Sequence, residues 1–212
     1  MPTVCPSVDE FKTLLLNRPL KTVVVEQLFT GLPFAFSRTP SVMDTLRRHI
    51  NRRLGVALND IVVIGSARIG FSLDPENFPR KFSRYSDIDV LIVNQELFDK
   101  VWQTLLAWHY PRRFVLPESD WTWLKKRRDA VYWGWLEPDR VEYTGIGFPE
   151  ELLPMRDLSA KWFNTFQSMS RFPDFMSRRI SGRLYRTWDH AMAYQVFSLN
   201  LIRKSIQEPN RE

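Results

Sequence analysis

The chain has few residues of the types that bind zinc or form disulfides: one cysteine, Cys5, and three histidines among 212 residues. A single cysteine cannot close a disulfide within the chain, and it is compatible with a reducing cytoplasm. Structural zinc sites need several cysteine or histidine ligands. The composition therefore argues against disulfide-rich proteins and against zinc-binding domains.

Long apolar runs are also absent. A transmembrane helix needs about 20 consecutive apolar residues, and no run in this sequence approaches that length. The first residues, MPTVCPSVDEFK, contain no basic region followed by an apolar stretch, which is the pattern of a secretory signal. We therefore expect a cytoplasmic protein without a membrane partner.

Hydrophobic residues make up 44% and charged residues 25% of the sequence, as in ordinary soluble globular proteins. The net charge is +6, and the basic residues are clustered. Such clusters are compatible with a nucleic-acid or polyphosphate partner, although solvated helix faces produce the same pattern. The clusters lie at residues 47–53, 125–128 and 178–186.

The stretch 61–93 contains two apolar runs that are typical of core strands. The first run, Ile61–Ile64, is followed directly by Gly65 and Ser66. Glycine lets the backbone approach a ligand closely, and the amides and the hydroxyl group of such a step can hold phosphate oxygens. This end of the run is therefore a candidate phosphate site.

The second apolar run, 90–93, is introduced by Asp87, Ile88 and Asp89. Side chains alternate across a strand, so the two aspartates project to the same side. Neighbouring carboxylates repel each other unless a cation lies between them, and a divalent metal such as Mg²⁺ or Mn²⁺ prefers oxygen ligands. Together with the Gly-Ser step, the acids predict a site for a metal-bound nucleoside triphosphate. A turn with two solvated acids is the alternative.

The order of these features resembles a known family. A strand that ends in GS, a short helix, and a strand that carries DxD resemble the polymerase-beta-like nucleotidyltransferase superfamily. The strings GSARIGFSL and SDIDVLIV are similar to a group of small bacterial nucleotidyltransferase-domain proteins. The resemblance is strongest over residues 60–94 and extends more weakly over residues 33–206.

This resemblance implies an α+β fold, in which helices pack a small mixed sheet and further helices lie at both ends of the chain. We expect one domain over residues 1–212. Its core would cover about residues 40–146, and a C-terminal helical part would cover about residues 150–206.

In the resembled superfamily the DxD pair binds the catalytic metals and the Gly-Ser step holds phosphates. The resemblance therefore assigns metal binding and catalysis to Asp87 and Asp89, and phosphate binding to Gly65 and Ser66. Two further candidates for contact with the triphosphate are Ser86, which precedes the acids, and Arg68.

A third carboxylate from a later strand completes the site in that superfamily. Glu142 is the best candidate because β-prone residues flank it, whereas Asp139 lies in an expected turn and Asp129 in an expected helix. Without a third acid, the metal site would be incomplete, or the protein would be a binding or scaffold module.

Local signals elsewhere predict mostly helices. Ser7 and Glu10 fit a capping box, Pro40 suits the first turn of a helix, and Thr187 precedes a long apolar periodicity. The expected helices lie at residues 7–19, 39–55, 95–109, 118–135 (with Ser119 or Asp120 as its cap), 155–169 and from 187 onward.

Other segments are less regular. Residues 22–29 fit either a strand or a helix, and residues 113–116 and 141–146 are candidates for short strands. Residues 71–85 contain two prolines and several basic residues, and we expect them to form a loop over the acidic site.

The leading functional hypothesis is a metal-dependent nucleotidyltransferase that moves an NMP group from an NTP to a hydroxyl group of RNA, protein or a nucleotide. The resemblance also implies a bacterial toxin–antitoxin or phage-defence setting. The alternative is a catalytically degenerate member of the fold that binds nucleotide, nucleic acid or a partner protein.

Overall fold

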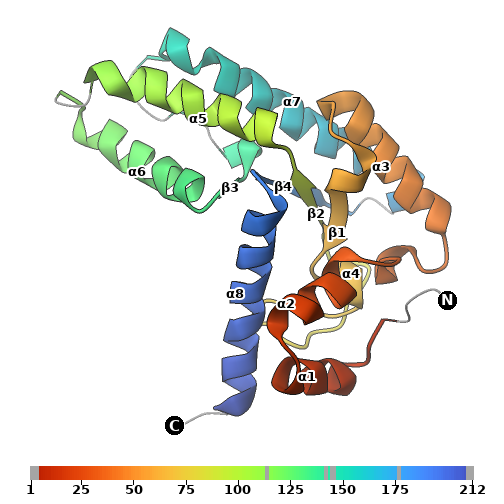
Figure 1. Cartoon of the computed structure of the whole chain (residues 1–212). Coiled ribbons are helices and arrows are strands. Elements are labelled where there is room, and N and C mark those ends of the chain that lie inside the picture. Colours follow the sequence, from red (N-terminus) through yellow and green to blue (C-terminus); the bar gives the residue numbers. More distant parts are fainter. Residues whose placement is uncertain (1–4, 113–114, 141–142, 144–146, 176–177, 209–212) are drawn as a thin grey trace.

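The computed structural model describes residues 5–112, 115–140, 143, 147–175 and 178–208. It has the predicted α+β fold, with helices around a small mixed sheet (Figure 1). The strands within the described residues are β1 (Ile61–Ile64), β2 (Ile88–Val93), β3 (Trp135–Leu136) and β4 (Ile180–Tyr185).

Helices make up most of the remaining structure. The α-helices are α1 (Val8–Asn17), α2 (Leu20–Val23), α3 (Pro40–Leu54), α4 (Ser66–Ile69), α5 (Gln95–His109), α6 (Glu118–Tyr132), α7 (Leu153–Met169) and α8 (Trp188–Gln207). A π-helix, η1 (Val24–Phe29), continues α2, and short 3₁₀ turns are η2 (Phe34–Phe36), η3 (Leu58–Asp60), η4 (Tyr110–Arg112), η5 (Pro138–Arg140), η6 (Glu150–Leu152) and η7 (Pro173–Phe175). None of the helices in the described residues combines the length and apolar character needed to cross a bilayer.

Several helix boundaries follow from local sequence signals, as predicted. The Ser7 side chain and Glu10 form a capping box at α1, α3 begins at a proline and ends at Gly55 in the left-handed conformation, and the Thr187 side chain accepts a hydrogen bond from the His190 amide at α8. The ambiguous segment 22–29 is helical.

The strand order is β1-β2-β4-β3. Strand β2 pairs with β1 in antiparallel orientation and with β4 in parallel orientation, while β3 pairs with β4 in antiparallel orientation. In this register Asp89 lies between Ile64 of β1 and Ser181 of β4. Residues from distant parts of the chain therefore meet at Asp89.

Strand β4 corrects the expected layout. Within the single domain, a core was expected at about residues 40–146 and a helical part at about residues 150–206, yet β4 lies within this helical part and is an interior strand of the sheet. Its sequence, ISGRLY, carries serine, glycine and arginine at its centre, which hides the strand pattern. Contacts with distant residues, such as the pairing of Arg183 with Glu137, stabilise these residues in the sheet.

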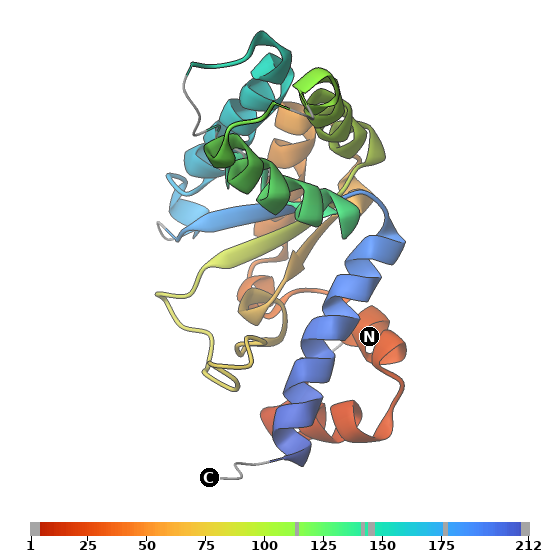
Figure 2. The same cartoon turned by 90° about the vertical axis from the view of Figure 1, so that its left-hand side faces the viewer.

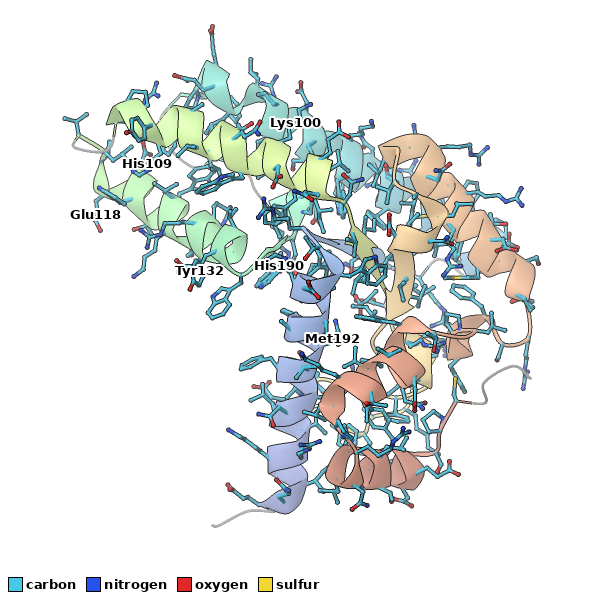
Figure 3. The ribbon with its side chains drawn as sticks, viewed as in Figure 1. Lys100, His109, Glu118, Tyr132, His190 and Met192 are labelled. Atoms are coloured by element: carbon cyan, nitrogen blue, oxygen red, sulfur yellow. The ribbon has the colours of Figure 1, made fainter. Side chains whose placement is uncertain are left out.

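The prediction for residues 118–135 placed the first residue of the helix correctly, at Glu118, but was wrong about its cap and its end. Asp120 does not cap α6, since Pro117 is the N-cap residue and the Asp120 carboxylate accepts hydrogen bonds from the Tyr143 hydroxyl. The helix ends early because Gly134 has a φ of 72° and packs on His190, where an added Cβ would lie 1.9 Å from the ring. His190 is labelled at the start of α8 in Figure 3.

The other candidate strands lie largely outside the described residues. This applies to Arg113 and Phe114 in the first segment and to all of residues 141–146 except Tyr143. Leu116 and Tyr143, which are described, belong to no strand.

The two faces of the sheet are covered by different helices. Val63, Val90 and Leu184 belong to the large core that includes buried residues of α3, α5 and α7. On the opposite face, Leu91 and Tyr185 pack with Ala191 of α8 and with Phe29 of η1. Because side chains alternate along a strand, Asp89 points to this second face.

Helix α8 extends well beyond the sheet (Figures 1 and 2). One of its faces packs on α1 and α2, where Leu199 and Ile202 are fully buried and Met192 joins the same cluster (Figure 3). The Arg203 guanidinium donates hydrogen bonds to the carbonyl oxygens of Leu15 and Arg18, which lie at the end of α1. The N-terminal helices therefore fix the outer half of α8.

We expect Gly182→Ala to destabilise the protein, because an added Cβ would lie 2.3 Å from the Phe166 ring and 3.0 Å from the Trp162 ring. Overpacking of this kind lowers the free energy of unfolding by about 1–3 kcal/mol, measurable by urea denaturation. The exposed Ala193→Ser on α8 should change it by less than about 0.5 kcal/mol. Equal stability of the glycine variant and the unmodified protein would contradict this packing.

Candidate functional site

The two predicted acids lie at the beginning of β2. Asp87 is exposed and precedes the strand, and Asp89 is partly buried within it. The Ser181 hydroxyl of β4 donates a hydrogen bond of 2.7 Å to Oδ1 of Asp89. This bond fixes the orientation of the carboxylate against the sheet.

The environment of Asp89 disfavours its negative charge. Burial raises the pKa of Asp89 most, and the charge of Asp87 raises it further. The Ser181 hydrogen bond and the positive charges of Arg183 and Arg179 lower this pKa, but the net shift is upward. A bound cation at this point would reverse the unfavourable charge balance.

Gly65 lies directly against this carboxylate. It has φ and ψ angles of 65° and −148°, a region that is almost exclusive to glycine. A Cβ at this position would also lie 3.2 Å from Oδ2 of Asp89. The turn between β1 and α4 therefore brings its backbone close to the acids, as expected for a Gly-Ser step beside a ligand site.

Two hollows meet at Asp87 and Asp89. The smaller one, called the phosphate hollow below, has a volume of about 320 Å³ and is mainly polar. Its lining residues come from the Gly-Ser turn, the following loop and β2: Gly65, Ser66, Ser72, Leu73, Asp74, Arg80, Tyr85, Ser86, Asp87 and Asp89. Hydroxyl groups, an arginine and three carboxylates, those of Asp74, Asp87 and Asp89, suit a metal-bound anion.

The second space, called the large hollow below, has a volume of about 620 Å³. It lies between the start of β2, strand β4, the turn η5, the loop after α4 and helix α8. The polar lining residues include Glu137, Asp139, Arg140, Arg179, Ser181, Arg183 and Ser198, and the apolar ones include Leu73, Tyr194, Phe197 and Leu201. The site therefore has room for more than a triphosphate group.

The loop expected over the site does border it. A bridge between Phe71 and Lys81 closes the base of the loop, and its residues line both hollows. Arg178 connects its far end to β4 by donating hydrogen bonds to the carbonyl oxygens of Ser83 and Ser86. Part of the 178–186 basic cluster thus holds the segment just before Asp87.

The structure brings five of the predicted site residues together. Gly65, Ser66, Asp87 and Asp89 line the phosphate hollow, as does Ser86, whose hydroxyl also accepts a hydrogen bond from the Ser83 amide.

Arg68 is placed elsewhere. It is 3% exposed and donates from Nε to the Gln27 carbonyl oxygen, and it lines neither of the two hollows. Arg80, which the sequence interpretation did not select, is the arginine that lines the phosphate hollow. Sequence proximity to the Gly-Ser step is a poor guide here, because the helical turn of α4 directs Arg68 into the interior.

The candidate third carboxylate, Glu142, lies outside the described residues. Among the residues that are described, no group of three or more acidic, histidine or cysteine side chains is arranged to hold a metal ion. Asp139 of η5 lines the large hollow, and burial raises its pKa. Arg179 lies near both Asp139 and Asp89, since its charge lowers the pKa of each.

Arg183 organises the wall of the large hollow. It forms an ion pair of 2.7 Å with Glu137, which also pairs with Arg140 at 2.9 Å. Its guanidinium lies 4.8 Å from the Trp135 ring centre and 4.7 Å from that of Tyr194. This stacked arrangement joins β3, β4 and α8. This cluster was not predicted from the sequence, because β3 and β4 were not identified as strands.

Comparisons of the chain with protein-family models, with curated proteins and with solved structures found no match. The functional argument therefore depends on the geometry of the two hollows and their acids.

We expect Asp89→Asn to raise the Tm of the metal-free protein by about 2–4 °C at neutral pH, the shift that roughly 1 kcal/mol produces at this chain length. The folded pKa of Asp89 is raised, so its contribution to stability is present at acidic pH and lost as the pH rises through that pKa. The gain should therefore vanish in acid, as calorimetry across pH would show.

Asp157→Asn on the exposed surface of α7 is a matched control. Added Mg²⁺ should raise the Tm of the unmodified protein more than that of Asp89→Asn. A lower Tm for Asp89→Asn at neutral pH would show that the Asp89 charge is not in an unfavourable environment.

Proposed function

We propose that this protein is a metal-dependent nucleotidyltransferase that transfers an NMP group from an NTP to a hydroxyl acceptor. The observation that carries the proposal is the position of Asp87 and Asp89 at the junction of two hollows. The phosphate hollow has the hydroxyl and glycine lining that suits a triphosphate, and the large hollow has room for the rest of the donor and for an acceptor.

The acids fit a divalent metal such as Mg²⁺ or Mn²⁺. Both supply carboxylate oxygens, the ligands that these hard cations prefer, and the raised pKa of Asp89 reflects a charge that the protein itself does not neutralise. When bound, the metal would neutralise the charge that develops on the transferred and leaving phosphate oxygens.

The chain's own residues would perform the positioning. The backbone and hydroxyl group of the Gly-Ser step would hold the terminal phosphates, assisted by Arg80 at the edge of the phosphate hollow. The Ser181 hydrogen bond would keep Asp89 in a fixed orientation. Such fixed donors and carboxylates stabilise a phosphoryl transition state without reorganisation during the reaction.

We infer that Asp139 accepts the proton of the attacking hydroxyl group. It lines the large hollow and not the phosphate hollow that would hold the leaving phosphates, and its raised pKa improves it as a general base. Arg179, whose charge acts on both Asp139 and Asp89, would help to orient the reacting phosphate between them.

The first test is transfer of label from each of the four α-labelled NTPs to RNA, protein and nucleotide acceptors. Asp87→Asn and Asp89→Asn should each lower the rate at least about 100-fold, since each removes a charged ligand of the metal. Asp157→Asn should leave the rate unchanged. Equal labelling by the unmodified protein and both site variants would refute the assignment of these acids.

The second test concerns the proton acceptor. Asp139→Asn should lower kcat by about 10²- to 10⁴-fold and remove the acidic limb of the pH–rate profile, and Asp139→Glu should restore part of both. Glu142→Gln serves as the parallel variant. Loss of activity in Glu142→Gln with normal activity in Asp139→Asn would transfer the role to Glu142.

A second candidate function is a binding module built on a degenerate nucleotidyltransferase fold. The observation that favours it is the neutral residue Ser181, which pairs with Asp89 on the later strand β4. In the resembled superfamily a later strand supplies the third carboxylate. This candidate predicts that NTP binds equally well with Mg²⁺ or with EDTA and that no acceptor is labelled. Metal-dependent binding together with turnover would exclude it.

A further inference from the structure

Helix α8 presents apolar side chains to the large hollow. Phe197 is 63% exposed and Leu201, one helical turn later, is 38% exposed, and both line that hollow. They lie on the other side of the helix from the buried cluster with α1 and α2. Phe197 is five residues after Met192, which places it about 140° around the helix from the packed face.

The position of this surface is fixed by its neighbours. Tyr194, one turn before Phe197, contacts the rings of Tyr185 and Trp135 and the Arg183 guanidinium. On the other face, Arg203 fixes the outer half of α8 to the end of α1. The backbone that carries Phe197 is therefore fixed at the edge of the hollow, which reduces the freedom lost when its ring binds a flat ligand.

The chemistry of the lining changes with distance from the acids. The end near Asp87 and Asp89 is charged, with Arg179 and Asp139 beside it, while the α8 side is mainly apolar with two hydroxyl groups, those of Tyr194 and Ser198. The loop contributes the apolar residues Leu73 and Pro75 and the acidic Asp74 between them to the same hollow. This sequence of charged, then apolar and weakly polar surfaces matches a nucleotide, whose phosphate is followed by ribose and base.

We propose that Phe197, Leu201 and Ser198 form a nucleobase-binding subsite in the large hollow. The proposal rests on the proposed function, because it assumes a phosphate group at Asp87 and Asp89. The base would stack on the Phe197 ring with Leu201 extending the apolar surface, and the Ser198 hydroxyl would bond the ribose or the base edge. Every base has a stacking face, so the subsite would tolerate several bases.

The base would come either from the donor NTP or from a nucleotide acceptor. The test compares equilibrium binding of three probes in the presence of Mg²⁺: inorganic tripolyphosphate, ATP and a short single-stranded oligoribonucleotide. Tripolyphosphate reports on the phosphate hollow alone. ATP and the oligoribonucleotide report on the donor base and on the acceptor base.

Phe197→Ala should weaken binding of ATP, of the oligoribonucleotide or of both by about 10-fold or more, with tripolyphosphate binding unchanged. Phe197→Trp should retain the binding that Phe197→Ala loses, because it keeps a flat ring. Phe163→Ala is the matched control, since Phe163 is a 50% exposed phenylalanine on α7 outside both hollows. Loss of the ATP signal alone assigns the donor base, and loss of the oligoribonucleotide signal alone assigns the acceptor base.

Unchanged binding of both nucleotide probes by Phe197→Ala would overturn the subsite. So would an equal loss of tripolyphosphate binding, because that would show a general disturbance of the site. If the unmodified protein binds tripolyphosphate, and binds ATP and the oligoribonucleotide no more tightly than tripolyphosphate, the subsite fails and the phosphate hollow stands. If it binds none of the three, both the subsite and the proposed function fail.

Discussion

The parallel pairing of β2 with β4 is the constraint on which the rest of the structure depends. A parallel pair needs a long crossover connection, and here the connection contains α5, α6, β3 and α7. Those elements supply much of the core on one face of the sheet. The other face is left for η1 and α8, and Asp89 points to it. The site therefore exists only because the last strand joins the first two.

That arrangement places a carboxylate where its charge is unfavourable in the metal-free protein. The sheet buries Asp89, Asp87 adds a second negative charge, and Gly65 approaches so closely that an added Cβ would lie 3.2 Å from Oδ2 of Asp89. Ser181 and the nearby arginines offset the charge only in part. A partly uncompensated acid beside a special glycine is a common feature of sites that bind a ligand.

The helices were accessible from sequence because their signals are local. A capping box at Ser7, a proline at residue 40 and a threonine cap at residue 187 each act within one helical turn, and the structure has all three. Strand β4 and the end of α6 were not accessible. The strand contains Ser181, Gly182 and Arg183, which packing and ion pairing stabilise in the sheet. Helix α6 ends where Gly134 packs against His190 of α8.

The sequence by itself determined two local features, because each depends only on residues that are close along the chain. The conformation of glycine determines the Gly-Ser turn, and the alternation of side chains along a strand places both acids at the start of β2 on one side. Only the tertiary structure decided what surrounds them. Ser181 bonds Asp89 across 92 positions of sequence, Asp139 and Phe197 reach the large hollow from separate elements, and Arg68 turns away from it. Such contacts depend on strand register and helix packing, which no local pattern specifies.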